Sequence, residues 1–216
     1  MSGAEFQRAR SPQAKQQRYE AILDAAQHLG AARGVSQVTL TEIAEAVGMH
    51  KSAMLRYFET REEIFLQLTA TAWQEWSRCV RHQLTALQTP APADVADVFA
   101  ETLTARGFFC DLLAQTPLHL ERNVSVDAVR GYKLIALAEF SEIVAALRQS
   151  LPALSAESAG DAVATATSLA GSFWHIATPG PEVAALYRSD PQLAHAIVEI
   201  RPRLTRILTA LLDGML

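Results

Sequence analysis

The residues best suited to chemistry in this sequence form a short polar and cationic run, His50-Lys51-Ser52-Ala53, with Arg56 three positions further on. Lys and Arg side chains donate hydrogen bonds to guanine and equally to phosphate, so Lys51 and Arg56 suit contact with DNA. His50, Ser52 and Ala53 fall at the start of the same predicted helix, where side chains approach base edges. The methyl group of Ala53 could make an apolar contact with the methyl group of thymine. The pattern predicts a nucleic-acid contact.

A second group of side chains flanks the first and suits contact with phosphate: Thr39, Thr41, Tyr57 and Arg61. Their hydroxyl and guanidinium groups, together with backbone N–H groups at helix N-termini, are donors that phosphate oxygens accept. A surface role stays open for the two arginines, Arg56 and Arg61. Glu59 or Glu63 could pair with either guanidinium.

Side chains that could support catalysis do not fall into recognised patterns. The six histidines lack HExxH or paired-acid spacing, no serine lies in GxSxG, and no glycine-rich phosphate loop occurs. Cys79 and Cys110 make neither a metal-ligand spacing nor a disulfide framework, and nothing basic closely flanks Cys110 to indicate a redox switch. We therefore expect no catalytic residue, no metal site and no cofactor.

The second half of the chain carries aromatic residues that could form a core or line a pocket. Small ligands bind in apolar pockets that hold a few polar groups. The candidate pocket residues are Thr102, Phe109, His119, Tyr132, Trp174 and His175. His175 follows Trp174 on an apolar helix. It could therefore be a core residue whose hydrogen bonds are made within the protein, or it could contact a ligand.

The elements that must position these side chains are all helical, because apolar residues recur at helical spacing and no stretch alternates as a β-strand would. The expected helices cover residues 15–34, 40–48, 51–57, 61–88, 94–115, 126–149, 157–178 and 190–211. In the helix over 126–149, the expected inward side includes Leu134 and Leu137.

Two capping boxes bracket the cationic run. Thr39 stands three residues before Glu42, and Thr60 three residues before Glu63, which is the spacing that pairs each side chain with the other's backbone N–H. Gly48 ends the first of these helices. The two short helices must pack on their neighbours, because helices of this length are not stable alone.

The composition is that of a globular protein, with 216 residues, 50% of them hydrophobic and 19% charged. The net charge is −4, and residues 1–68 hold eight basic and eight acidic side chains, so the excess acid lies beyond them. A basic opening segment that includes Arg8, Arg10 and Arg18 suits phosphate contact or a solvated tail. Without a signal sequence or an apolar run of membrane-spanning length, we expect a cytoplasmic protein.

The stretch over residues 39–65 resembles the DNA-binding domain of the TetR family of bacterial repressors. That family's pattern is, loosely, a Thr, an Ile-Ala pair, a Gly, a short recognition helix, an aromatic pair, and a basic residue before two acids. The matching residues here are Thr39, Ile43-Ala44, Gly48, the segment 50–56, Tyr57-Phe58 and Arg61-Glu62-Glu63. The resemblance covers residues 15–68, and the remainder resembles the family in being helical and of suitable length.

The resemblance implies an all-α protein with three parts. Residues 1–14 are then a flexible basic arm, 15–68 an N-terminal three-helix helix-turn-helix domain, and 69–216 a C-terminal helical ligand-binding and dimerisation domain. It further implies a homodimer held by helices over 157–178 and 190–211, a near-palindromic double-stranded DNA operator, and an unknown small-molecule effector of apolar or amphipathic character.

One position departs from the family. Members usually carry a Tyr that touches phosphate where this chain has Leu55, so either that contact is absent or Arg56 and Tyr57 provide it. We expect a ligand-released repressor. Two alternatives stay open, namely a helical ligand-binding or protein-interaction dimer that has lost DNA binding, and a small helical enzyme that uses the second-half pocket.

Overall fold

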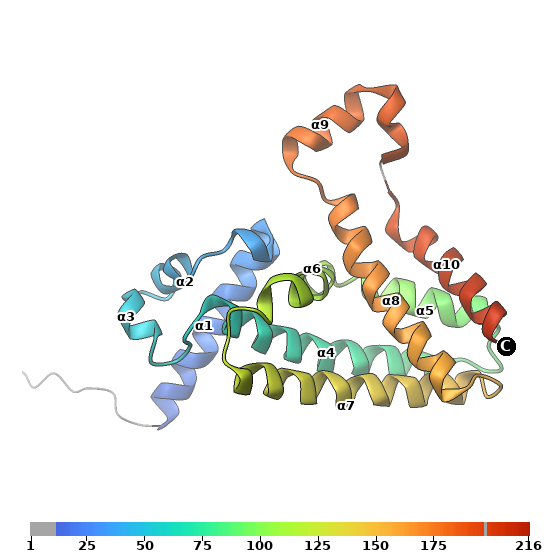
Figure 1. Cartoon of the computed structure of the whole chain (residues 1–216), viewed down its shortest axis with the longest axis horizontal. Coiled ribbons are helices and arrows are strands. Elements are labelled where there is room, and N and C mark those ends of the chain that lie inside the picture. The colour runs from blue at the N-terminus through green and yellow to red at the C-terminus, as the bar shows by residue number, and fades with distance from the viewer. Residues whose placement is uncertain (1–11, 197) are drawn as a thin grey trace, which may run out of the picture.

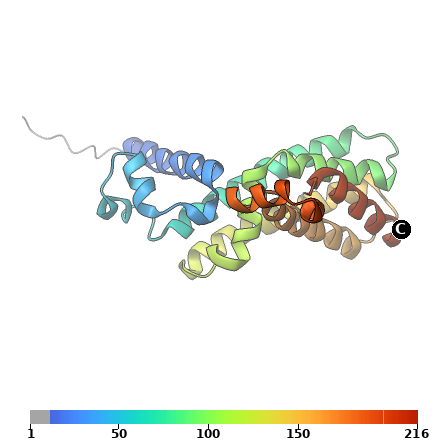
Figure 2. The same cartoon turned by 90° about the horizontal axis from the view of Figure 1, so that it is seen from above.

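A computed structural model of the chain describes residues 12–196 and 198–216, and every regular element within them is helical. The expected all-α fold is therefore confirmed. Three N-terminal helices form a lobe at one end of the molecule, and the long helices α4 (Arg61–Ala86) and α7 (Val126–Ser150) run side by side away from it (Figure 1). The view from above shows the same N-terminal lobe joined to a larger helical body (Figure 2).

The first helix, α1 (Pro12–Arg33), is already helical at the first described residue, Pro12, three residues before the expected start at Lys15. Proline is favoured in the first turn of a helix, because the N–H that it lacks would be unpaired there and its φ is already helical. Residues 12–14 of the expected arm are therefore helical. The rest of that arm, with Arg8 and Arg10, lies outside the described residues.

Helix α2 (Leu40–Ala46) begins at the capping box that the sequence predicted. The Thr39 hydroxyl oxygen accepts the N–H of Glu42 at 3.2 Å, and the Glu42 carboxylate accepts the N–H of Thr39 at 2.8 Å. Two of the N–H groups that a helix start leaves unpaired are thereby satisfied.

The turn after α2 depends on Gly48, whose φ of 64° lies in the left-handed region. Its N–H donates to the carbonyl of Glu45 at 3.0 Å, and the next N–H, of Met49, donates to the carbonyl of Ala44 at 2.8 Å. This pair of bonds is the Schellman arrangement, which satisfies the last carbonyls of a helix and reverses the chain.

Helix α3 (Lys51–Met54) is shorter than the helix expected over residues 51–57. The N–H of Tyr57 donates to the carbonyl of Met54 at 2.8 Å, three residues back, so the chain tightens into a turn. This turn carries Met54 and Phe58 into the core, where both are buried as predicted.

Helix α4 begins after Thr60, whose hydroxyl oxygen accepts the N–H of Glu63 at 3.2 Å. Only this half of the expected second capping box forms, because the Glu63 carboxylate accepts the N–H of Glu59 at 2.7 Å. The expected apolar stripe is buried at Ile64, Phe65, Leu68, Trp76, Val80 and Leu84.

Two helices, α5 (Pro92–Thr104) and α6 (Gly107–Gln115), stand where one helix over 94–115 was expected. The break falls next to Gly107, where a Cβ atom would lie 2.1 Å from the ring of Trp174 on helix α8 (Ala156–Ala177). This approach requires a glycine, and glycine weakens a helix interior. A π-helical turn, η2 (Thr116–Leu120), then continues α6 through Pro117.

Helix α7 begins after the predicted N-cap Ser125 and packs on α4 and α8. Its buried residues are Tyr132, Ile143 and Leu147. The expectation that Leu134 and Leu137 point inward is wrong. Their side chains are 52% and 62% exposed, because α7 meets its neighbours through another face.

The last segment is also divided differently from the expectation. A short helix that was not predicted, α9 (Pro181–Ser189), is followed by the 3-10 turn η3 (Pro191–Ala196), and α10 (Ile200–Met215) replaces the helix expected over 190–211. The Asp190 carboxylate accepts the N–H of Gln192 at 2.9 Å, which favours a turn there over a continuous helix. Helix α9 has no buried residue and projects from the body (Figure 1).

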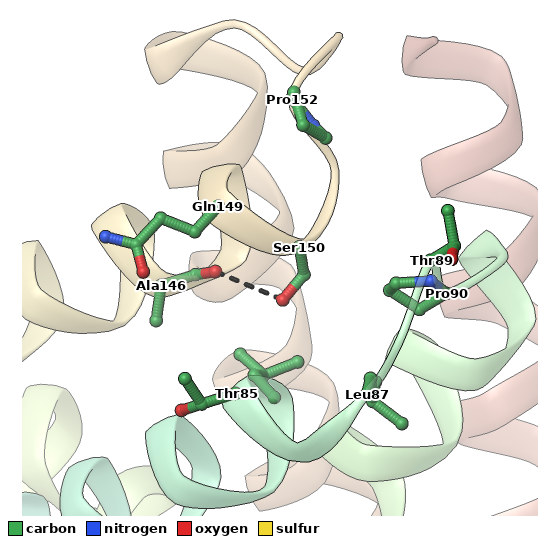
Figure 3. A pocket seen from close by; sticks show the side chains of 9 residues that line it. Thr85, Leu87, Thr89, Pro90, Ala146, Gln149, Ser150 and Pro152 are labelled. Carbon is green, nitrogen blue, oxygen red and sulfur yellow. Dashed lines mark hydrogen bonds between the residues drawn. The ribbon is translucent and has the colours of Figure 1, made fainter.

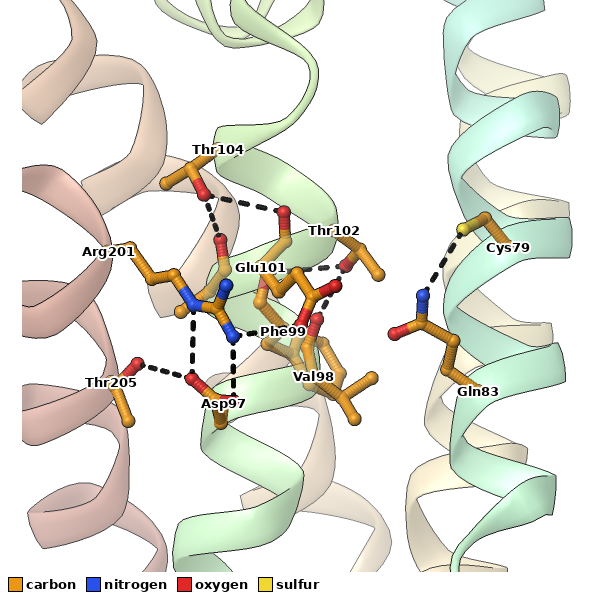
Figure 4. A network of polar contacts seen from close by, with 11 residues as sticks. Cys79, Gln83, Asp97, Val98, Phe99, Glu101, Thr102, Thr104, Arg201 and Thr205 are labelled. Atoms are coloured by element: carbon orange, nitrogen blue, oxygen red, sulfur yellow. Dashed lines mark hydrogen bonds and ion pairs between the residues drawn. The ribbon is translucent and has the colours of Figure 1, made fainter.

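Helix α10 is held against α5 by a polar network (Figure 4). The Arg201 guanidinium donates to both carboxylate oxygens of Asp97, at 2.9 and 3.3 Å, and to Glu101 at 2.8 Å. The Thr205 hydroxyl also donates to Asp97, at 3.3 Å. Through its hydrogen bonds and charge, Arg201 lowers the pKa of the Asp97 carboxyl.

Among the helices described, none combines the length and apolar character needed to cross a lipid bilayer.

Candidate nucleic-acid interface and ligand cavities

Most of the predicted DNA-contacting residues lie on α2, α3 or the segments next to them, and Arg61 is the first residue of α4. Helices α2 and α3 lie at the outer end of the N-terminal lobe (Figure 1). The exposed members of the predicted set are Thr39, Thr41, His50, Lys51, Ser52 and Arg56, while Ala53 and Tyr57 are half-buried. Lys51 and Arg56 form no ion pair with any residue that the structure describes. Two free cations therefore stand on this surface, and the expected alternative pairing of Arg56 with Glu59 or Glu63 is not seen.

Arg61 differs from these cations because its guanidinium is already engaged. It donates to the carbonyls of Val35 at 3.0 Å and of Val38, and it pairs with Glu62 at 2.8 Å. These bonds tie the start of α4 to the segment that leads into α2. They favour a positioning role for Arg61 over the phosphate contact expected from the sequence.

Thr39 is engaged in a similar way. Its N–H and its hydroxyl both donate to the Glu42 carboxylate at 2.8 Å. The hydrogen bonds from the Thr39 backbone and side chain, followed by that from Arg33, lower the pKa of Glu42 to about 2. With both of its donors used, Thr39 caps the helix in this arrangement.

Arg18, which was grouped with the basic opening segment, lies on α1 and donates to the carbonyl of Val47 at 3.4 Å. Leu55, the departure from the family pattern, is 52% exposed on the same lobe as Lys51 and Arg56. The surface therefore presents an apolar side chain where the family usually has a hydroxyl group.

The candidate ligand residues of the second half are not gathered into one cavity. Thr102 is buried in the core, where its hydroxyl accepts the indole N–H of Trp76 at 3.0 Å and donates to the carbonyl of Val98 at 2.8 Å. Its polar atoms are satisfied within the protein. Phe109 packs edge-on against Trp73, with ring centroids 5.5 Å apart, and lines a small cavity of about 150 Å³.

Two further candidates are also separated from one another. Tyr132 lines a cavity of about 200 Å³ between the N-terminal lobe and α7, and burial raises the pKa of its hydroxyl to about 12. His119 is exposed on the η2 turn. A cavity of about 320 Å³ lies at the C-terminal ends of α4 and α7, away from the N-terminal lobe. Its walls include Thr85, Gln149 and Ser150 but no charged side chain (Figure 3).

Trp174 and His175 do come together, in a cleft of about 530 Å³ between the N-terminal lobe and helices α6 and α8. The ring of His175 lies with its Nε2 atom 3.1 Å from the Oδ1 atom of Asp111, whose side chain is only 6% exposed. The other oxygen of Asp111 accepts the N–H of Val35 at 2.7 Å. Asp111 was not singled out from the sequence, since its partner on the first lobe is 76 residues away and no local pattern marks the pair.

Comparison with protein families gives two matches that together cover most of the chain. Residues 22–68 match the model of bacterial regulatory proteins of the tetR family, and residues 70–216 match the tetracyclin repressor-like C-terminal domain. A comparison with curated protein sequences gave no significant match.

Solved structures share the fold at low sequence identity. The fatty acid degradation regulator FadR from Bacillus halodurans is 15% identical, with a TM-score of 0.57 over 92% of this chain and 99% of that one. FadR from Thermus thermophilus, a repressor in complex with lauroyl-CoA, is 18% identical, with a TM-score of 0.59 over 92% and 95%. FadR from Bacillus subtilis, in complex with stearoyl-CoA, is 14% identical, with a TM-score of 0.55 over 89% and 98%.

Proposed function

Since the chain belongs to the TetR family of bacterial regulatory proteins and is thus a DNA-binding transcriptional regulator, we propose that it is a homodimeric repressor which a small molecule releases from a near-palindromic operator. The observation that carries this proposal is the pair of exposed cations, Lys51 and Arg56, on a helix-turn-helix whose turn and cap are internally satisfied. Such a motif holds its second helix ready for a DNA major groove.

The proposed contacts divide by chemistry. Lys51 and Arg56 bind guanine edges or phosphate, and the side chains at the start of α3 (His50, Ser52 and Ala53) approach base edges. Thr41 and Tyr57 donate to phosphate. Thr39 and Arg61 act mainly by holding α2 and α4 in place, because their donors are engaged within the lobe.

The proposed dimer joins the outer faces of α8 and α10. Many of the small residues of α8, such as Ala166 and Gly171, are buried within the chain, so its remaining outward positions, including Ala164 and Ser168, would meet the second copy. Helix α9 supports association independently. An isolated helix of nine residues is not stable in water, and this one exposes Val183 and Leu186 without burying any residue in its own chain.

A two-fold dimer places its two recognition helices about 34–36 Å apart, one turn of B-DNA, which requires a near-palindromic operator. The effector that we propose is apolar or amphipathic. Two of the fold neighbours hold acyl-CoA molecules, which are amphipathic. An effector releases DNA by the difference between its affinities for the DNA-bound and free conformations.

Fluorescence anisotropy with DNA from upstream of the chain's own gene tests the proposal. We expect the Lys51→Ala/Arg56→Ala protein to bind at least about 100-fold more weakly than wild type, because each base contact that is removed costs about 1–3 kcal/mol. The matched control is Arg78→Ala/Arg130→Ala, which removes the same charge from exposed positions of α4 and α7. Sequence-specific binding that survives the first double substitution would overturn the assignment of α3.

A further inference from the structure

The cleft between the N-terminal lobe and the helical body, which Trp174 and His175 line, has the size of a ligand site. Its volume of about 530 Å³ falls within the range of about 300–1,000 Å³ that small-molecule pockets occupy. The end of α1 and the 3-10 turn η1 (Val35–Gln37) form one side, and α6 with the end of α8 forms the other. The cleft is larger than the three cavities lined by Thr85, Phe109 and Tyr132.

Two aromatic rings on the walls of the cleft lie close against glycines. A Cβ atom at Gly107 would lie 2.1 Å from the Trp174 ring, and one at Gly30 would lie 2.7 Å from the Phe108 ring. Any side chain at either glycine would push the facing ring away. Both rings therefore lie close to the backbone, Trp174 to that of α6 and Phe108 to that of α1, and both line the cleft.

Asp111 provides a buried carboxylate in the same cleft. Its Oδ2 atom accepts the N–H of Val35, but its Oδ1 atom has no hydrogen bond, although the His175 ring lies at 3.1 Å. A buried carboxylate oxygen without a donor is costly. Because the His175 side chain is 44% exposed, a ligand can displace it without disturbing the core.

The charge of the cleft favours a cation. Three lining residues carry or can acquire charge: Arg33, Asp111 and His175. The Arg33 guanidinium is paired with Glu42 at 2.8 Å, which leaves the Asp111 carboxylate without a permanent countercharge. An anionic ligand would meet this carboxylate at close range.

We propose that this cleft binds an arylalkylamine, whose ammonium group donates to Oδ1 of Asp111 and whose ring packs on Trp174 and Phe108. The ammonium group donates to the open acceptor oxygen, and the two aromatic rings bury the apolar part of the ligand. This inference rests on the proposed function, because it names the class and the site of the effector.

The site is coupled to the DNA-binding lobe through Val35. The Asp111 carboxylate on α6 accepts the N–H of Val35, and the Arg61 guanidinium on α4 donates to the carbonyl of Val35 at 3.0 Å. A ligand that draws Asp111 away from its present position therefore shifts η1, which precedes the Thr39 cap of α2. The amine stabilises whichever conformation of the chain binds it more tightly. The factor by which bound amine changes the affinity for DNA equals the factor by which bound DNA changes the affinity for the amine.

Isothermal titration calorimetry with three ring-matched probes tests the ligand class: phenethylamine, 2-phenylethanol and phenylacetate. We expect phenethylamine to bind the full chain with a Kd on the order of 1 mM or tighter, at least tenfold more tightly than the other two. Equal affinities, a preference for phenylacetate, or no measurable binding of phenethylamine at that concentration would overturn the proposal.

Substitutions locate the site. Asp111→Asn keeps the shape of the side chain and removes its charge, so it should lower the affinity for phenethylamine at least tenfold and leave that for 2-phenylethanol unchanged. The control Asp24→Asn, at an exposed position on α1, should have no effect. His175→Ala should raise the affinity severalfold by removing the displaced ring. Unchanged affinity in Asp111→Asn, or a tenfold fall in His175→Ala, would contradict the assignment.

If Asp111→Asn does not fold, the wild-type chain still decides the matter. Saturation with phenethylamine should shift the Val35 amide resonance, and an unmoved resonance would overturn the site. Operator binding is measured separately. DNA binding without a preference for the amine refutes the site alone, whereas amine selectivity that depends on Asp111 in a chain that binds no operator refutes the proposed function alone.

Discussion

At the scale of single residues, the cations of the helix-turn-helix divide into those that are free and those that hold the fold. Lys51 and Arg56 are exposed, while Arg61 is half-buried and bonded to backbone carbonyls before α2. Net charge conceals this difference, since residues 1–68 are neutral overall. We therefore expect the DNA affinity of this lobe to depend on which cations remain unpaired.

Arg61→Ala should affect stability and DNA binding in a way that identifies a positioning residue. Loss of its bonds to the carbonyls of Val35 and Val38 should lower the free energy of unfolding by about 1–3 kcal/mol, as measured by urea denaturation. Operator affinity should fall, but the slope of log affinity against log salt should stay unchanged. A slope reduced by about 1 per protomer would instead show that Arg61 neutralises a phosphate.

Glu42 provides a pH-dependent contribution with a defined sign. Its pKa falls from an ordinary value of 4.5 to about 2 in the folded chain, so its stabilising effect is present above pH 4.5 and is lost as the pH falls towards 2. An NMR titration of the Glu42 carboxyl should show this low midpoint. In Arg33→Ala the midpoint should move upwards, and a wild-type midpoint near 4.5 would show that the capping box does not form in solution.

At the scale of elements, the turn between α2 and α3 depends on one backbone conformation. Gly48→Ala should destabilise the fold by about 1–2 kcal/mol, because an L-residue with a side chain is disfavoured in the left-handed region. No atom lies within 4 Å of the position a Cβ would take, so the cost comes from the backbone alone. Thermal unfolding of this variant measures it, with the exposed Gly131→Ala in α7 as the control that should not destabilise.

Helix α9 should be required for stable association. We expect Leu186→Glu to weaken dimerisation at least about tenfold in sedimentation equilibrium, because it places a charge on the apolar side of an element that buries nothing in its own chain. The control Ala185→Glu adds the same charge at an adjacent exposed residue. Equal dimerisation constants for wild type and Leu186→Glu would remove α9 from the interface.

The sequence predicts local structure well where both partners lie within a few residues. The Thr39 capping box, the Gly48 turn and the burial of Met54 and Phe58 all follow from neighbouring residues, and all are confirmed. The break between α5 and α6 does not, because it reflects the close approach of Trp174 to Gly107 from a distant helix.

The candidate site is harder to predict for the same reason. Lys51 on α3 and Arg56 in the turn after it could be named from residue type alone, but the engagement of Arg61 depends on backbone carbonyls, which no side chain marks. Of the six candidate ligand residues, Trp174 and His175 meet in the cleft, whereas Thr102 is satisfied in the core. Asp111 becomes part of the cleft only because the folded chain brings α6 next to η1, where its carboxylate accepts the N–H of Val35.

At the scale of the whole molecule, a DNA-reading lobe is joined to a helical body through shared hydrogen bonds at Val35. Arg61 on α4 donates to the carbonyl of Val35, and Asp111 on α6 accepts its N–H. The lobe and the body are therefore connected by hydrogen bonds as well as by the chain. We therefore expect a change in the body that moves α6 to shift the segment before α2. This connection is what a ligand-released repressor requires.

The most direct test of DNA binding by this surface is an ionic-strength series of operator affinity for the wild-type chain. If a dimer neutralises about six to eight phosphates, log affinity should fall with log salt at a slope of about −5 to −7, near −0.9 per contact. In Lys51→Ala/Arg56→Ala the slope should become shallower by up to about 4, in proportion to the phosphates that the two protomers no longer neutralise. A wild-type slope near zero would contradict the claim that this surface binds DNA.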